Sequence, residues 1–140
     1  MNKIVLCQSD DEIAACFPVM QQLRPHIEAS EFVARINAQQ SMGYKLICII
    51  NDAAVVAVAG YRIGLSLAWG KHVYVDDLVT DSTIRSRGLG QSLMQWLLDE
   101  ARKQGCKQLH LDSGVQRQQA HRFYEREGMR FASKHFMIDL

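Results

Sequence analysis

Proline, net charge and long apolar runs are all scarce in this chain. Its 140 residues include only two prolines, Pro18 and Pro25, and the formal net charge is +1. A near-neutral balance gives no general electrostatic reason to bind nucleic acid. No apolar run reaches the roughly 18 residues that a membrane span needs, and the start of the sequence does not resemble a secretory leader. We therefore expect a single cytoplasmic domain over residues 1–140, with neither nucleic acid nor membrane as a partner.

The cysteines and histidines lack the spacing of a metal site. Cys7, Cys16, Cys48 and Cys106 are far apart in the sequence and form no C-x-x-C pair. Free cysteine is among the most buried residue types, so we interpret these four as reduced thiols of the core. The five histidines show no zinc-like spacing either. The sequence therefore predicts no metal site.

Hydrophobic periodicity and turn residues predict alternating strands and helices. Helices are expected over residues 10–23, 28–40, 88–104 and 118–127. Strands are expected over residues 3–6, 44–50, 53–61, 72–80, 107–111 and 131–138, with Asn51-Asp52 turning a hairpin. This order predicts an α/β domain of the α+β type, with a mixed, mostly antiparallel sheet and about four flanking helices.

The segment Arg-Ser-Arg-Gly-Leu-Gly at residues 85–90 stands between a predicted strand and a predicted helix. Two glycines in a first helical turn each cost about 0.5–1 kcal/mol relative to alanine. Helix N-termini favour acids, yet Arg85 and Arg87 stand here and no acid follows before Asp99. The combination indicates a phosphate site. It is neither a P-loop, which needs Gly-Lys-Ser or Gly-Lys-Thr, nor a dinucleotide fingerprint, since Leu93 replaces the third glycine.

Three segments in a fixed order resemble the GCN5-related N-acetyltransferase (GNAT) family. Residues 85–90 match its [Q/R]-x-x-G-x-[G/A] pyrophosphate motif, and Val-Asp-Asp-Leu-Val-Thr at residues 75–80 is similar to the strand before that motif. Ala-His-Arg-Phe-Tyr-Glu-Arg-Glu-Gly-Met at residues 120–129 resembles its A-x-x-[FL]-Y-x-x-x-G-[FM] signature. The region around residues 115–128 more closely resembles small bacterial enzymes that acetylate compact amines, including aminoalkylphosphonate N-acetyltransferases.

The resemblance implies acetyl-CoA as co-substrate, held by backbone groups. A bulged strand would splay from its neighbour so that the pantetheine arm pairs with the backbone of about Leu78, Val79 and Thr80, and the Val79 N–H would polarise the thioester carbonyl. The pyrophosphate would lie on the start of the helix. The expected cofactor-binding residues there are Arg85, Ser86, Arg87, Gly88, Leu89, Gly90 and Gln91. Arg117 replaces an asparagine of many members, and it could meet the cofactor's 3′-phosphate, an anionic acceptor or only solvent.

The same resemblance assigns two proton-transfer roles. Tyr124, expected near the start of its helix, would protonate the leaving thiolate, and Asp76 would take a proton from the amine directly or through water. Adjacent strand residues point to opposite faces, so only one of Asp76 and Asp77 is expected to serve the acceptor. A purely structural carboxylate is the alternative for either residue.

These features predict transfer of an acetyl group to a primary amine, of a small molecule, by direct attack in a ternary complex. A protein lysine or N-terminal acceptor is the alternative substrate class. A noncatalytic acyl-CoA-binding module is the alternative without chemistry. A homodimer is a family-level expectation, and the sequence carries no code for the acceptor.

Overall fold

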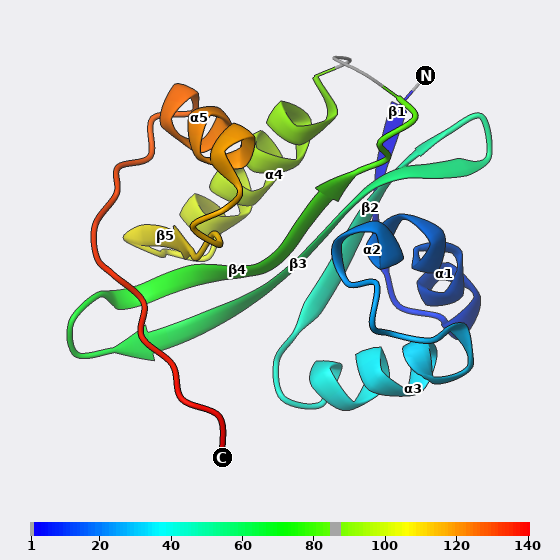
Figure 1. Cartoon of the computed structure of the whole chain (residues 1–140), viewed down its shortest axis with the longest axis horizontal. Coiled ribbons are helices and arrows are strands. Elements are labelled where there is room, and N and C mark those ends of the chain that lie inside the picture. Colours follow the sequence, from blue (N-terminus) through cyan, green and yellow to red (C-terminus); the bar gives the residue numbers. More distant parts are fainter. Residues whose placement is uncertain (1, 85–87) are drawn as a thin grey trace. The chain divides into compact units, whose positions relative to one another are not determined.

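The computed structural model describes residues 2–84 and 88–140, so the predicted phosphate residues Arg85, Ser86 and Arg87 lie outside the described part. The chain forms two compact units, of which the first runs to His110 and the second covers Leu111–Leu140. Figure 1 shows the elements of each unit. Among the described residues, the helices are all too short or too polar to cross a bilayer.

The first unit is built on a twisted sheet with the order β1-β2-β3-β4-β5. The pairs β1–β2, β2–β3 and β3–β4 are antiparallel, and the sheet as a whole is mixed. The fold class predicted from the sequence is therefore confirmed. The strands are β1 (Asn2–Cys7), β2 (Lys45–Asn51), β3 (Ala54–Ser66), β4 (Gly70–Thr80) and β5 (Gln108–Leu111).

One predicted helix is in fact two. Residues 10–23 form α1 (Asp10–Ala15) and α2 (Phe17–Leu23), which meet at Cys16. Pro18 lies in the first turn of α2, where its missing N–H is tolerated, whereas within one continuous helix it would remove a hydrogen bond and clash with the preceding turn. The described residues therefore contain five helices, the others being α3 (Ala29–Gln40), α4 (Leu89–Lys103) and α5 (Gln118–Arg126).

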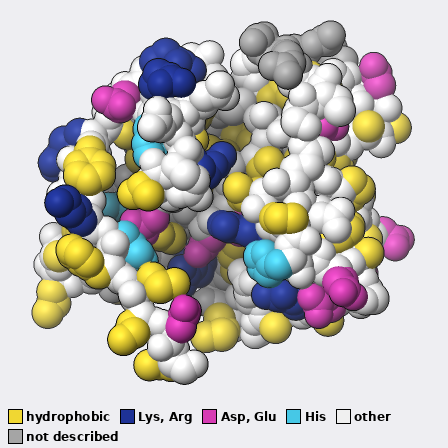
Figure 2. Space-filling view, in the orientation of Figure 1, with side chains coloured by type: hydrophobic (Ala, Val, Ile, Leu, Met, Phe, Trp, Pro, Cys, Tyr) yellow, Lys and Arg dark blue, Asp and Glu magenta, His cyan; other side chains and the backbone are white. Residues whose placement is uncertain are grey.

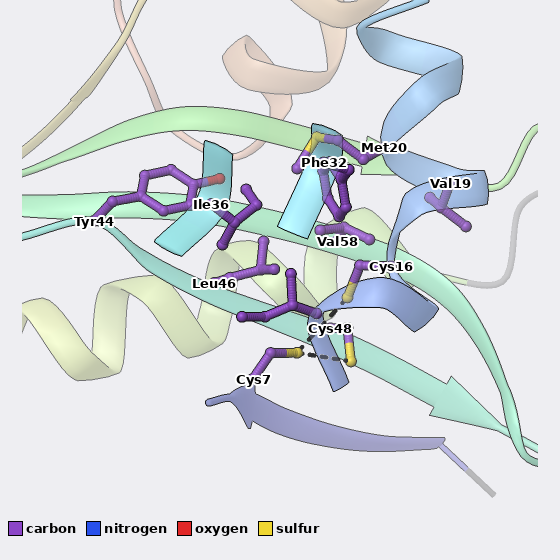
Figure 3. Packing of buried hydrophobic residues seen from close by; sticks show 11 residues of the cluster. Cys7, Cys16, Val19, Met20, Phe32, Ile36, Tyr44, Leu46, Cys48 and Val58 are labelled. Atoms are coloured by element: carbon purple, nitrogen blue, oxygen red, sulfur yellow. Dashed lines mark hydrogen bonds between the residues drawn. The ribbon is translucent and has the colours of Figure 1, made fainter. Parts of the chain in front are cut away.

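Alternation along β2 separates the two faces of the sheet. Leu46 and Cys48 belong to the core shared with α1, α2 and α3, which Figure 3 shows from close by. Residues of the opposite parity, Ile47 and Ile49, are also fully buried, so both faces are covered. On the face that α4 covers, Trp96 packs edge-on against Tyr61 at 5.8 Å between ring centroids.

The β3–β4 hairpin is longer than predicted. Its strands continue to Ser66 and from Gly70, beyond the predicted ends at residues 61 and 72, because cross-strand pairing persists through Leu65↔Lys71. At its end Trp69 stacks on His110 with 3.5 Å between ring centroids. The stacking gives this tryptophan a packing role.

The predicted closing strand over residues 131–138 is wrong. Residues 129–140 have no regular secondary structure, and residues 130–140 are exposed. The β-like composition of Phe131 to Ile138 is not sufficient, because a strand needs a partner for its backbone groups and none is assigned to it in the described chain.

Candidate functional site

A bulge in β4 organises the candidate site. Gly60 pairs with Asp77 and Tyr61 pairs with Val75, so Asp76 is the extra residue that has no direct partner on β3. A bulge interrupts the alternation of side chains. Asp76 and Asp77 accordingly both line one cavity. The prediction that Asp76 and Asp77 point to opposite faces rested on regular alternation, which the bulge interrupts.

The cavity lies between β4 and the α2–α3 region and has a volume of about 300 Å³. Basic side chains and the two aspartates line it together with apolar core residues. Figure 2 shows basic, acidic and histidine side chains gathered near α3 on this face. The lining residues are Met20, Arg24, His26, Ile27, Phe32, Arg35, Ile36, Gln39, Asp76 and Asp77.

Asp77 is held on both of its oxygens. Arg24 Nε donates to Asp77 Oδ1 at 2.9 Å, and the Tyr44 hydroxyl donates to Oδ2 at 2.8 Å. Arg24 Nη2 also donates to the Asp76 carbonyl at 2.8 Å, so one guanidinium ties α2 to the bulge. Burial, together with the charge of Asp77, raises the pKa of Tyr44 well above its ordinary value, so its phenol stays protonated and remains a donor.

Gly60 makes the Tyr44–Asp77 contact possible. A Cβ at residue 60 would overlap the hydroxyl and the ring of Tyr44. The glycine stands in β3 directly opposite Asp77. Its lack of a side chain opens the path along which the tyrosine reaches the carboxylate.

Asp76 faces a different arginine. Arg62 Nε and Nη2 donate to the two Asp76 oxygens at 2.9 and 2.8 Å, a bidentate pair that also raises the pKa of Arg62. The Arg62 guanidinium lies 5.6 Å from the centre of the Tyr74 ring. The Asp76 side chain is 22% exposed and that of Asp77 13%, so Asp76 is the more accessible carboxylate.

The pairing of β4 with β3 determines which backbone N–H groups at the end of β4 point away from β3. The Asp81 N–H donates to the Val56 carbonyl at 2.8 Å. Hydrogen-bonded pairs recur every second residue, so the pair Val79↔Val58 also directs its N–H groups between the strands. The prediction that the Val79 N–H is the oxyanion donor therefore does not fit. The N–H groups of Leu78 and Thr80 point away from β3 instead.

β5 is short and does not extend to the end of β4 that contains Leu78 and Thr80. The Lys107 N–H, just before β5, donates to the Lys71 carbonyl near the start of β4. β5 then has only four residues, whereas six residues lie between Lys71 and Leu78. β5 is too short to run beside Leu78 and Thr80. The splayed strand pair itself stays a prediction.

The start of α4 provides oriented N–H groups. Gly88 is its N-cap with φ 69°, in the left-handed region, and has no side-chain cap. The first turn holds no acid, and the amides of Leu89, Gly90 and Gln91 precede the first intrahelical bond, which Ser92 donates to the Gly88 carbonyl at 2.9 Å. Gly88 is thus required by its own backbone conformation, and the amides after it suit an anion.

The second unit contains Tyr124, in the last turn of α5 rather than near its start as predicted. Burial raises the pKa of the Tyr124 phenol, and the charge of Arg117 partly opposes that rise. Arg117, whose role the sequence left open, is the N-cap residue of α5 and interacts with Tyr124. The phenol stays protonated at neutral pH, as a general acid must.

Comparison with known proteins settles the family. Residues 8–129 match the Acetyltransferase (GNAT) family. The chain belongs to this family. GNAT proteins are acetyl-CoA-dependent acyltransferases, and the chain is accordingly an N-acetyltransferase by family. The uncharacterized N-acetyltransferase YhdJ of Bacillus subtilis is 36% identical over 117 residues, which cover 83% of this chain and 82% of that protein.

Two further relatives carry named acceptors. The aminoalkylphosphonate N-acetyltransferase of Salmonella typhimurium is 36% identical over 62 residues, covering 44% of this chain and 39% of that protein. The glucosamine 6-phosphate N-acetyltransferase of Arabidopsis thaliana is 35% identical over 105 residues, covering 71% and 68%. A crystal structure of the latter enzyme has a TM-score of 0.80 at 24% identity and covers 99% of this chain and 98% of that one. The resemblance inferred from the sequence is confirmed.

The sequence missed the residues that hold the two aspartates. Arg24 directly follows α2, Tyr44 directly precedes β2 and Arg62 lies in β3, and none of them matches a family motif. Gly60 was the one local signal, because a glycine inside a strand marks a bulge or a close approach. The pairing partners themselves depend on register, which a single sequence does not specify.

Proposed function

We propose that this GNAT protein transfers the acetyl group of acetyl-CoA to the primary amine of a small molecule that also carries an anionic group. The observation that carries the proposal is the cavity beside the bulge. Asp76 and Asp77 line one wall together with Arg24, which contacts both of them, and Arg35 and His26 lie elsewhere in the lining. A zwitterionic acceptor would match both signs of charge.

Acetyl-CoA would supply the thioester, and this chain has backbone groups suited to hold it. The N–H groups of Leu78 and Thr80 are directed away from β3 and would pair with the pantetheine arm, one of them polarising the thioester carbonyl. The amides of Leu89, Gly90 and Gln91 at the start of α4 would receive the pyrophosphate, with Arg85, Ser86 and Arg87 of the family motif beside them.

Asp76 would accept the proton of the ammonium group, directly or through water. It is the more exposed aspartate, and Arg62 holds its two oxygens in place while each oxygen keeps a further lone pair. Asp77 is committed to Arg24 and Tyr44, and we assign it the positioning of Arg24. Tyr124 would return a proton to the leaving thiolate.

Arg35 is the cation best placed to select the anionic group. Its only ion-pair partner among those found in the described residues is Glu31, at 3.4 Å, and both side chains are about half exposed. Exposed pairs of this kind contribute about 0–1 kcal/mol, so Arg35 can exchange this partner for a ligand at little cost. Arg24, in contrast, is already bound to Asp77 and the Asp76 carbonyl.

Calorimetry with acetyl-CoA tests the first half of the proposal. The wild-type protein should bind it, and a variant with Arg85 and Arg87 both changed to alanine should bind it more weakly. A steady-state screen then compares aminoalkylphosphonates and amino sugar phosphates with neutral amines of similar size. Transfer to peptide lysines alone would favour the alternative acceptor class, and cofactor binding without transfer to any amine would favour a noncatalytic module.

Arg35→Ala tests the anionic acceptor. We expect a KM increase of about tenfold for an aminophosphonate, equivalent to a loss of roughly 1.4 kcal/mol, and little change for a neutral amine. Arg102→Ala is the matched control, because Arg102 is also an exposed arginine in a helical ion pair but lies outside the cavity lining. An equal effect of Arg35→Ala on both amines would contradict the assignment.

A further inference from the structure

Three cysteines that are distant in the sequence converge in the core of the first unit. Cys7 ends β1, Cys16 joins α1 to α2, and Cys48 lies in the middle of β2. The Sγ atom of Cys7 is 3.4 Å from that of Cys48 and 3.7 Å from that of Cys16, and all three lie within 4.8 Å of one another. Figure 3 shows the three side chains pointing toward one point.

The separations suit a shared ligand. A point equidistant from three sulfurs so arranged lies roughly 2.1–2.4 Å from each, close to the metal–thiolate bond of about 2.3 Å. The side chains could therefore bind an ion with small adjustments only. Their exposed fractions are 1%, 0% and 2%, so the point is shielded from water.

The surroundings decide what kind of ion fits. The same cluster contains Ile13, Leu46 and Val58 and offers apolar groups around the sulfurs. Within the described residues the ligand set consists of these three cysteines alone, whereas structural zinc sites almost always have four ligands. Three thiolates with no carboxylate or imidazole in the set select a soft, thiophilic ion.

The net charge of the bound complex further limits the ions that fit this site. An uncompensated charge in a dry interior is costly. A trivalent ion bound by three thiolates is neutral overall, whereas a monovalent ion such as Cu(I) would leave two negative charges unless thiol protons remained. The dry interior therefore favours the neutral complex of a trivalent ion with the three thiolates.

We propose that Cys7, Cys16 and Cys48 form a buried site for a trivalent, thiophilic metalloid ion. Arsenite is the probe. Three As–O bonds break and three As–S bonds form, and the three thiol protons leave with the three hydroxides as three waters, without any change of oxidation state. The site is independent of acetyl transfer, because none of the three cysteines lines the cavity beside the bulge.

Binding is measured on the full-length protein after refolding with arsenite, Cu(I) or Zn²⁺, so that access to a buried site is not limiting. After desalting, elemental analysis and intact mass should show one arsenic per chain, with a raised Tm. X-ray absorption of the bound ion should show three sulfur neighbours and no oxygen. Retention of Cu(I) or Zn²⁺ but not of arsenite would overturn the proposal, as would retention of no ion by the folded protein.

Variants identify the ligands. Cys7→Ala, Cys16→Ala and Cys48→Ala should each lower arsenite retention at least tenfold, and Cys106→Ala is the matched control because Cys106 is a free, half-buried cysteine outside the cluster. Circular dichroism checks that each variant is folded. If an alanine variant does not fold, the sulfur count from X-ray absorption of the wild-type complex decides. Loss of binding only in Cys106→Ala, or a count other than three, would contradict the assignment.

Discussion

A missing side chain at residue 60 shapes the candidate site. Gly60 lets the Tyr44 hydroxyl reach Asp77, and Asp77 in turn holds Arg24 against the bulge. The carboxylate is only 13% exposed, so its hydrogen bonds replace much of the water that it would otherwise bind. The four residues therefore act as one unit.

Gly60→Ala should destabilise the protein by about 1–3 kcal/mol, the usual cost of forcing an extra methyl group into a packed interior. The added Cβ must displace Tyr44, so Arg24 would also lose its anchor. Urea denaturation measures the stability. Gly64→Ala is the control in the same strand, since its Cβ would meet only the outer edge of the His72 ring at 3.1 Å. Equal stability of the two variants would contradict the role of Gly60.

Tyr124→Phe tests the proposed acid. We expect kcat to fall by about 10²-fold or more, with a much smaller change in the affinity for acetyl-CoA. Because burial raises the pKa of Tyr124, the acid stays protonated beyond the ordinary tyrosine value. The kcat of the wild-type protein should therefore fall only above about pH 10, where the phenol loses its proton, and Tyr124→Phe should show no such fall. Unchanged kcat at saturating acetyl-CoA would argue against the role, and Phe123→Leu is the control for packing.

At the scale of elements, α1 begins with a complete capping box. The Ser9 hydroxyl accepts a hydrogen bond from the Glu12 N–H, and the Glu12 carboxylate accepts from the N–H groups of Ser9 and Gln8. These N–H groups favour the charged form and lower the pKa of Glu12. The box fixes the start of the helix that carries Ile13 and leads to Cys16.

Glu12→Gln should therefore destabilise the protein at pH 7 but not at low pH. Because the pKa of Glu12 is lower in the folded state than in the unfolded state, its ionised carboxylate stabilises the folded protein. This stabilisation is fully present above the ordinary glutamate pKa of about 4.3, and it is lost as the pH falls through the lowered pKa of the folded state. Thermal melts of both proteins from pH 7 to pH 2 measure this convergence. Asp11→Asn, in the same first turn, is the control. A constant difference at all pH values would contradict the prediction.

Elements with a strong local signal were predictable from the sequence. The predicted helix over residues 88–104 corresponds to α4 with its caps, because its apolar face, Gly88 and the following Gly105 all agree. The break at Cys16 was missed although Pro18 signalled it. The bulge at Asp76 could not be predicted, since it depends on how β4 pairs with β3.

At the scale of the whole molecule, the last residues are the least integrated part of the described chain. Residues 130–140 are exposed, including the large apolar side chains of Phe131, Phe136 and Ile138. His135 pairs with Asp112 at 3.4 Å, an exposed contact of small energetic value. Segments without burial or a backbone ladder are the first to be cleaved by proteases.

Limited proteolysis should therefore cut first within residues 129–140. Mass spectrometry at low trypsin ratios should show early cleavage after Arg130 or Lys134, before cleavage after Arg102 or Lys103 of α4. The α4 sites are the internal control, since they are exposed but lie in a regular helix. Protection of Arg130 and Lys134 from cleavage would show that this segment has a partner, and it would support the predicted strand over residues 131–138.

Function at this scale was predictable because three motifs in order identify the family, whereas the acceptor was not. The proposed acceptor site includes Arg24, Arg35, Asp76 and Asp77, which come together only when α2, α3 and β4 are folded. The convergence of Cys7, Cys16 and Cys48 was hidden in the same way, because ligands from separate elements leave no spacing pattern in the sequence.

The extra residue makes β4 one residue longer than the part of β3 with which it pairs. Deleting Asp76 would restore uninterrupted pairing with β3, because Gly60↔Asp77 and Tyr61↔Val75 would become consecutive pairs, but it would also remove the carboxylate. Val75 and Asp77 would then be neighbours that point to opposite faces, and residues 70–75 would keep their partners on β3. Chains of this design can therefore vary in length in the turn at residues 67–69, but not at the bulge.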